Sequence, residues 1–440
     1  MPVPLESKRP TSVRWIVAVL VMGFSFVSYM QRMNISLAAE LMMPDLSLSK
    51  VQMGQVFSSF LWGYAIFQVF AGKLGDTLGP RITLTVAAVL WGTMSLLTGL
   101  LPGRLLHGSL TVVVCLLPLR FILGAAEAAT YPVGTRAIRN WTPPHERARG
   151  NSLMVAGSSI AAAVTSPLVS WLMLRVGWRE SFYVTSWVAF AIAVVWYFVV
   201  TDHPWQHKWV NASELNLIAG GEPNARAPFR KRTSSVRKLL SEKNVLLLSL
   251  TYTCEGYVLF IFVFWLFIYL VEVRGFSVLK GGMVSSLPWL TAMVCTPIGG
   301  FACDRITARR GRMAGARATI MLGYGLSGIL LFAAAGSPNR VAAVAALCLS
   351  VGFLYFAEPA FWTTATFLGG ESSGAVSGIM NTAGILGGIV STSLVPVMVE
   401  HFGWMVALGS GAAVALLCTL SWFLMGQAGF AVDPLKQEVV

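Results

Sequence analysis

The sequence predicts an all-α polytopic membrane protein, with twelve transmembrane helices in two pseudo-symmetric six-helix bundles. Three observations lead to this fold class: an apolar composition, twelve long apolar segments, and a loop motif that returns halfway along the chain. Of the 440 residues, 55% are hydrophobic and only 12% are charged, against about a quarter charged in soluble domains. A soluble protein of this length cannot hide so much apolar surface from water, whereas a lipid bilayer accommodates it.

The apolar segments form two groups of six, separated by one polar stretch. Each segment is long enough to cross a bilayer. The first group is expected at about 14–38, 51–74, 81–101, 110–138, 150–174 and 180–201, and the second at about 244–271, 279–302, 314–335, 340–367, 373–398 and 402–425. We therefore expect an N-terminal bundle over 1–201, a solvated cytoplasmic linker over 202–243, and a C-terminal bundle over 244–440.

The basic residues indicate the orientation of the chain. The formal net charge is +13. The Lys and Arg residues concentrate in the segments that lie inside when the N-terminus is cytoplasmic, as the positive-inside rule requires. No basic helix or aromatic–basic platform is present, which argues against nucleic-acid binding. With short external loops and a first apolar run too long for a signal peptide, the pattern predicts a multi-pass protein of a bacterial inner membrane, with both termini cytoplasmic.

A glycine-rich loop with one acid and one base follows the second apolar segment and returns after the eighth. The aspartates of the two copies, Asp76 and Asp304, lie about half the chain apart. Glycines permit tight turns, and an acid near helix N-termini and basic side chains can latch one side of a bundle. Repeated halves are typical of transporters that bind substrate between them. The residues that we assign to conformational gating are Gly72, Asp76, Gly79, Arg81, Asp304 and Arg305.

This loop resembles the most diagnostic motif of the major facilitator superfamily. Four further blocks resemble its anion:cation symporters, which include bacterial sugar-acid transporters and the sialin group. The blocks are Tyr29–Ser36, Phe57–Tyr64, Arg120–Ala128 and Ser377–Asn381. The resemblance extends over nearly the whole chain. It implies a secondary transporter of small organic anions that works by alternating access, as a single chain and without a cofactor.

An arginine inside the first apolar segment is the leading candidate for substrate binding. Ser25, Tyr29, Arg32 and Ser36 recur at helical spacing, so they share one helix face. A charged side chain within a span is costly and marks a functional site by default. A guanidinium can hold a carboxylate through two parallel hydrogen bonds, and the resemblance implies this role for Arg32. The alternative is a side chain that extends to the membrane interface.

Polar residues at four other positions complete the predicted substrate site. Tyr29 and Tyr64 match positions that line the substrate cavity in the family, and phenols hydrogen-bond to carboxylates and hydroxyl groups. Gln68 follows Tyr64 by one helical turn, and Asn381 fits the family pattern in the eleventh span. For both tyrosines, packing in the core or at the membrane interface is the alternative.

Glu127 is the predicted proton-coupling residue, together with Arg120 on the same helix face. Burial favours the neutral form of a carboxyl group and a nearby arginine favours its charged form, so the balance can change as helices move. The resemblance also assigns this glutamate to coupling; a static pair with Arg120 is the alternative. Sugar-acid members of the family have an aspartate where this chain has Gln31, which cannot titrate. The proton stoichiometry and the coupling ion therefore stay open.

Two further acids interrupt spans of the second half, Glu255 in the seventh and Glu358 in the tenth. Glu358 precedes Pro359, which frees backbone carbonyl groups, so it is a candidate proton or cation site. We group both acids with the proton-coupling residues. Two positions that are often polar in the family are small or apolar here, Ser158 and Ile385. This difference favours an anion with fewer hydroxyl groups than a sugar acid.

Other classes of function lack support in the sequence. The histidines and cysteines show no metal-ligand spacing, and no nucleophile elbow or phosphate loop is present, so we expect neither an enzyme nor a metal site. The internal repeat disfavours a channel. We predict proton-driven import of a small organic anion. The alternatives are an uncoupled facilitator or exchanger and, less favoured because Arg32 and Arg120 make the site electropositive, a multidrug exporter.

Overall fold

The computed structural model describes residues 9–143, 146–219, 239–369 and 373–425. Its contacts divide the chain into two compact units. Unit 1 comprises Met1–Ile35, Trp62–Thr165 and Leu172–Arg230, and unit 2 comprises Ser36–Leu61, Ser166–Trp171 and Lys231–Val440. Two short segments from the first half of the sequence thus group with the second half.

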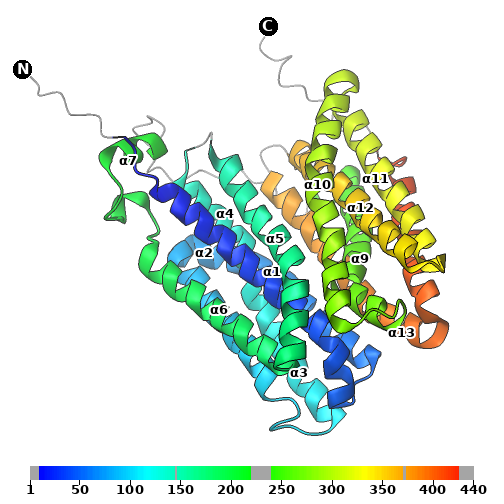
Figure 1. Cartoon of the computed structure of the whole chain (residues 1–440). Helices are drawn as coiled ribbons and strands as arrows, with labels where there is room; N and C mark the ends of the chain where they lie inside the picture. The colour runs from blue at the N-terminus through cyan, green and yellow to red at the C-terminus, as the bar shows by residue number, and fades with distance from the viewer. Residues whose placement is uncertain (1–8, 144–145, 220–238, 370–372, 426–440) are drawn as a thin grey trace, which may run out of the picture. The chain divides into compact units, whose positions relative to one another are not determined.

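Long helices follow the twelve expected segments along the chain (Figure 1). The first half contains α1 (Val13–Leu46), α2 (Lys50–Leu100), α3 (Ser109–Glu127), α4 (Thr130–Trp141), α5 (Arg147–Arg175) and α6 (Trp178–Val199). The second half contains α9 (Lys243–Glu272), α10 (Val278–Arg310), α11 (Arg312–Gly336), α12 (Arg340–Gly369) and α13 (Ser373–Ser421). The expected span at 110–138 is divided between α3 and α4.

Two of these helices each contain a sharp turn at a glycine. Gly79 in α2 has φ 82° and Gly403 in α13 has φ 78°, a backbone region that favours glycine. Each helix therefore carries two expected spans. Within the described residues, ten helices are long and apolar enough to cross a membrane. The all-α polytopic fold class is confirmed.

Glycines with positive φ recur at matching places in the two halves. Gly79 and Gly311 precede the third span of each half, with φ 82° and 88°. Gly177 and Gly403 precede the sixth, with φ 107° and 78°. The recurrence of these turns supports the internal repeat that the two aspartate loops indicate.

The interior of unit 1 fixes α1 against its neighbours. The ring of Phe24 packs edge-on against Trp91 of α2 and Trp196 of α6, with centroids 5.9 and 5.1 Å apart. Two residues after Arg32, the Asn34 amide donates to Thr185 Oγ1 of α6 over 3.1 Å. A buried, satisfied hydrogen bond of this kind specifies one helix register. It therefore determines which side chains of α1 face away from α6.

In unit 2, α9 packs along α13, and α12 packs against α10 and α11. Almost every residue of α9 from Tyr257 to Leu270 is buried. A Cβ added at Gly256 would collide with the carbonyl of Gly384 in α13. The two backbones therefore approach closely at Gly256, and its neighbour Glu255 is held in the interior.

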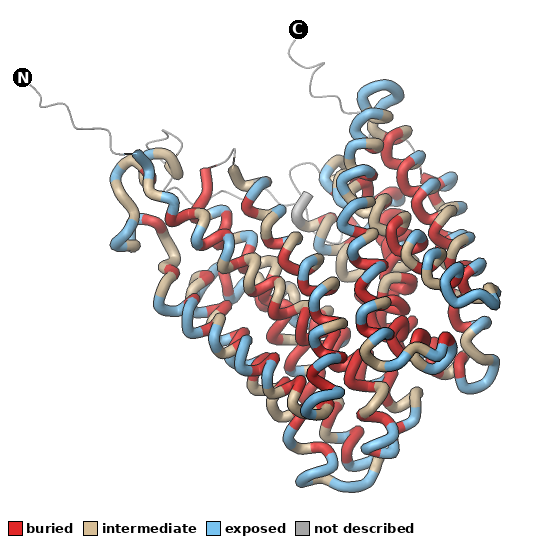
Figure 2. The backbone as a smooth tube through the Cα atoms, viewed as in Figure 1, coloured by how far each residue is buried: buried red, intermediate tan, exposed pale blue. Residues whose placement is uncertain are grey.

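Large apolar side chains cover much of the outer surface, where the backbone is marked as exposed (Figure 2). Phe198, Trp187 and Phe301 are 77%, 68% and 67% exposed. Patches of this extent are disfavoured in water, whereas lipid chains solvate them. The distribution is that of a membrane protein.

The start of the expected linker packs onto unit 1. It forms the short helix η2 (Pro204–Gln206) and α7 (Ala212–Ala219). The buried carboxylate of Glu214 accepts hydrogen bonds from the backbone amides of Val13 and Arg14, over 3.3 and 3.1 Å, and pairs with the Arg14 guanidinium. It thereby caps the free amides at the N-terminus of α1.

Burial lowers the pKa of His203, while Asp202 acts in the opposite direction. Residues 220–238 lie outside the described residues.

Candidate functional site

Three charged side chains are buried together in unit 1. Arg32 of α1 is 5% exposed, and Arg120 and Glu127 of α3 are 0% exposed. Arg32 contacts Glu127 Oε2 through one guanidinium nitrogen at 3.5 Å, a long ion pair. Ser28 Oγ donates to the same carboxylate oxygen at 2.9 Å. Glu127 Oε1 is buried and has no hydrogen-bond partner among the described residues.

This cluster carries an excess of positive charge. Arg120 interacts electrostatically with both Arg32 and Glu127. Arginine stays protonated in proteins, so two guanidinium groups face a single carboxyl group. A buried net positive charge is costly unless an anion compensates it. The arrangement therefore attracts a negatively charged ligand.

Two tyrosines lie beside the Arg32 guanidinium. Its central carbon is 4.9 Å from the ring centroid of Tyr29 and 5.0 Å from that of Tyr64. Rings at this distance stabilise the cation through their π faces. The Oε1 atom of Gln68 is buried and has no hydrogen-bond partner among the described residues. Tyr131 of α4 also lies close to this cluster, because its hydroxyl bonds to Ser25 Oγ over 3.2 Å.

Gln31 does not belong to the cluster. Its amide nitrogen donates to the carbonyl of Thr185 in α6 over 3.2 Å. The side chain is 1% exposed, and it joins two helices as Asn34 does. The position that is acidic in sugar-acid transporters is therefore occupied by a residue that fixes α1 to α6.

The predicted residues of the second half all belong to unit 2. Glu358 of α12 accepts from the hydroxyl of Tyr252 and from the indole N–H of Trp362, each over 2.7 Å. Glu255 of α9 is 4% exposed. Asn381 is partly exposed on α13. Arg32, Tyr29, Tyr64, Gln68, Arg120 and Glu127 all belong to unit 1.

The first glycine–aspartate loop makes specific contacts within unit 1. Asp76 forms an ion pair with Arg136 of α4. The amide of Arg81 donates to Asp202 Oδ1 over 2.8 Å, and its guanidinium donates to the Tyr197 carbonyl over 2.9 Å. A Cβ at Gly79 would collide with the Asp202 carboxylate. The glycine is therefore required by its positive φ and by a close neighbour.

The second loop differs from the first in its contacts. Asp304 and Arg305 are exposed on α10, and neither forms an ion pair or side-chain hydrogen bond within the described part of the chain. Both loops, however, contain a glycine that lies close to a proline of another helix. A Cβ at Gly72 would lie 3.7 Å from Pro132 of α4, and one at Gly300 would lie 3.7 Å from Pro359 of α12.

Several contributors were not predicted from the sequence. Ser28 precedes Arg32 by one helical turn, so its position on the same face was a usable signal. Tyr131 and Asp202 had no local signal, because their partners lie on other helices. The same holds for Arg136, the partner of Asp76.

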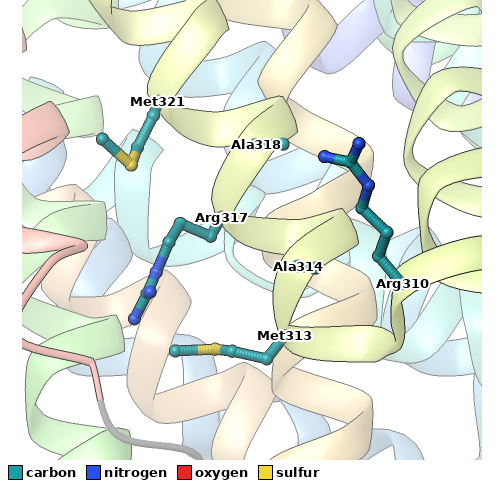
Figure 3. A pocket seen from close by; sticks show the side chains of 6 residues that line it. All are labelled: Arg310, Met313, Ala314, Arg317, Ala318 and Met321. Carbon is teal, nitrogen blue, oxygen red and sulfur yellow. The ribbon is translucent and has the colours of Figure 1, made fainter.

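A separate pocket lies at the start of α11 (Figure 3). Its volume is ≈ 340 Å³, and it is lined by Arg310, Met313, Ala314, Arg317, Ala318 and Met321. The Arg317 guanidinium also donates to the Met425 carbonyl over 2.9 Å. None of the predicted site residues lines this pocket.

Known proteins resemble the chain over most of its length. Residues 21–392 match the family model described as Major Facilitator Superfamily. A probable sulfoacetate transporter of Cupriavidus necator is 31% identical over 90% of both chains. A probable galactarate/D-glucarate transporter of Escherichia coli is 30% identical over 74% of this chain and 73% of its own. A hexuronate transporter of Bacillus subtilis is 29% identical over 82% and 83%.

Solved structures share the fold at lower sequence identity. A bacterial homologue of the human lysosomal transporter Spinster, inward-facing and occupied, matches with a TM-score of 0.74 and 15% identity, over 94% of this chain and 97% of that one. A D-xylose–proton symporter matches with a TM-score of 0.73 and 14% identity, over 95% and 100%.

Proposed function

The chain belongs to the major facilitator superfamily, and we propose that it imports a small organic anion by proton symport. Membership makes it a multi-pass membrane transport protein rather than an enzyme. Curated relatives that transport sugar acids and sulfoacetate place it with the anion:cation symporters of this superfamily. The substrate, the coupling ion and the residues that bind them form the proposal.

The observation that carries the proposal is the buried excess of positive charge around Arg32. In the proposed complex, the substrate carboxylate binds the Arg32 guanidinium through two hydrogen bonds. Tyr29 and Tyr64 flank that guanidinium at 4.9 and 5.0 Å, where their hydroxyl groups can complete the coordination of the anion. Gln68, which belongs to the same unit, contributes a polar group to this ligand. Asn381 of unit 2 stays a predicted substrate-binding residue. A cationic drug is disfavoured at such a site.

Proton coupling follows from competition for Arg32. When Glu127 is charged, it and the substrate carboxylate compete for the same guanidinium. A proton on Glu127, whose Oε1 atom lacks a hydrogen-bond donor, releases Arg32 to the substrate. The 3.5 Å ion pair is long enough to exchange for a closer partner. Arg120 maintains the positive potential in both states.

The substrate class is a carboxylate or sulfonate with few hydroxyl groups. Ser158 uses its hydroxyl within its own helix, donating to the Val155 carbonyl over 2.7 Å. Ile385 is 7% exposed and apolar. Both positions are often polar in transporters of sugar acids, and here they offer fewer partners to substrate hydroxyl groups. A compact anion of the sulfoacetate kind fits this description best.

The remaining assignments concern the cycle and its setting. We place the protein in a bacterial inner membrane, with both termini cytoplasmic, working as one chain with two six-helix halves. The loop around Asp76 would act as a cytoplasmic latch, since its pair with Arg136 is half-exposed and can open at little cost. Asp304 and Arg305 would serve the second half in the same way.

The test is uptake by the purified protein in liposomes. A panel of labelled sulfoacetate, D-glucarate, D-galactonate and D-glucuronate would be compared with a labelled organic cation. We expect uptake of at least one anion and none of the cation, loss of anion uptake in Arg32→Ala, and normal uptake in the matched surface variant Arg309→Ala. Cation uptake, or anion uptake that is unchanged in Arg32→Ala, would contradict the proposed substrate site.

A further inference from the structure

The two halves of the chain place the same hydrogen bond at the same position. In the first half, the hydroxyl groups of Ser25 in α1 and Tyr131 in α4 bond over 3.2 Å. In the second half, Tyr252 in α9 donates to Glu358 in α12 over 2.7 Å. Each bond joins residues 106 positions apart, and the second pair follows the first by 227 positions. The two bonds therefore align α1 with α9 and α4 with α12 at this offset.

The aligned positions carry opposite charge in the two halves. At the same offset, Glu255 corresponds to Ser28, the residue that donates to Glu127. The counterparts of Arg32, Arg120 and Glu127 are three leucines, Leu259, Leu347 and Leu354. The second half thus keeps the position and replaces a mostly basic cluster with two carboxyl groups.

Glu358 is held by two hydrogen-bond donors. Two donors, the Tyr252 hydroxyl and the Trp362 indole, converge on its Oε1 atom. Hydrogen bonds to a carboxylate favour its charged form. Trp362 is 40% exposed and Glu358 is partly exposed, so Glu358 lies nearer the surface of unit 2 than Glu255 does.

Glu255 has the opposite surroundings. Its side chain is 4% exposed and makes no hydrogen bond or ion pair within the described part of the chain. It repels Glu358. The other titratable groups around it come from α9, α11 and α13, and none is basic: Tyr252, Cys254, Tyr324 and Cys418. Two buried carboxyl groups without a base cannot both stay charged.

We propose that Glu255 is a second proton-binding site, beside the hydrogen-bonded Glu358, so that two protons enter with each anion. The step adds one proton to the Glu255 carboxylate and breaks no other bond. The inference rests on the proposed proton symport and deepens it. It supplies in the second half the titratable group that Gln31 cannot provide in the first.

The proton-to-anion ratio tests this directly. The purified protein in liposomes would be given a fixed gradient of labelled D-galactonate or sulfoacetate, whichever the wild type takes up, with the membrane potential held at zero. The pH gradient at which net flux stops would be measured, because it gives the proton-to-anion ratio whatever the charge of the anion. We expect two protons per anion in the wild type, one in Glu255→Gln, and two again in Glu255→Asp, which restores a carboxyl group. Glu242→Gln, an exposed residue before α9, is the matched control and should keep two.

Each result decides between the claims. A wild type that moves one proton per anion overturns the inference even if the variants do not fold. A Glu255→Gln variant that still moves two also overturns it. A wild type whose flux ignores the pH gradient contradicts the proposed symport itself. Substrate exchange without gradients, measured on every variant, separates loss of coupling from loss of folding.

Discussion

At the scale of single residues, helical spacing carried most of the information about the site. Tyr29 and Arg32 fall on one face of α1 in the sequence, and the structure places the ring of one 4.9 Å from the guanidinium of the other. Glu127 and Arg120, seven residues apart, are both fully buried. The partners from other helices were not predictable, because Tyr131 and Arg136 meet Ser25 and Asp76 only in the fold.

Arg32→Lys is the most informative substitution at this scale. Lysine keeps the positive charge but loses the planar fork that binds a carboxylate twice. One charge-assisted hydrogen bond contributes about 1.5–3 kcal/mol, so we expect the apparent affinity for the anion to fall about tenfold or more. Competition by unlabelled anion against labelled uptake measures it. An unchanged affinity would mean that Arg32 acts only as a point charge. Arg309→Lys, the same substitution at an exposed position, is the control.

At the scale of elements, the apolar segments located the helices well, and the turns depended on single glycines. The break in α2 at Gly79 was marked in the sequence by the adjacent proline. The packing of α7 against α1 was not, because Glu214 and Arg14 lie 200 residues apart and meet only in the fold. Composition alone favoured a solvated linker over 202–243. In the structure, the buried carboxylate of Glu214 holds the first part of this segment against α1.

Gly79→Ala tests the turn in α2. Alanine would have to adopt φ 82° and meet the Asp202 carboxylate, a strain of about 1–3 kcal/mol. We expect a lower midpoint of thermal unfolding in detergent. Gly72→Ala is the matched control, because its Cβ would make only an ordinary contact at 3.7 Å with Pro132. Equal midpoints for the two variants would show that the turn does not need a glycine.

Glu214→Ala tests the cap that α7 provides for α1. Among the described residues, the substitution leaves the Arg14 guanidinium with Glu146 as its one acidic partner, and it frees the first amides of α1. Breaking a buried ion pair costs about 3–5 kcal/mol, so we expect a clearly lower unfolding midpoint. Faster cleavage by a protease within 202–219 is expected as well. Wild-type behaviour in both assays would show that the contact of Glu214 with α1 does not stabilise the fold. Glu242→Ala, a substitution at an exposed position, is the control.

At the scale of the whole molecule, the sequence predicted the class of fold because hydrophobic length and repetition are global properties. The repeat of Asp76 at Asp304 indicated two related halves, and the recurring glycine turns support this. The asymmetry between the halves was less visible. The charged cluster of Arg32, Arg120 and Glu127 has only leucines at the matching positions. The repeat therefore conserves the helix arrangement and divides the chemistry unequally.

The most direct test of proton symport is accumulation of the anion by wild type and Glu127→Gln in liposomes, each with and without an inward proton gradient. Exchange of labelled for unlabelled anion without a gradient would be measured in parallel. We predict that the wild type accumulates the anion only with the gradient, and that Glu127→Gln loses accumulation while it keeps exchange. Accumulation by the wild type without a gradient, or a Glu127→Gln variant that accumulates like the wild type, would contradict coupling through Glu127 and favour a facilitator.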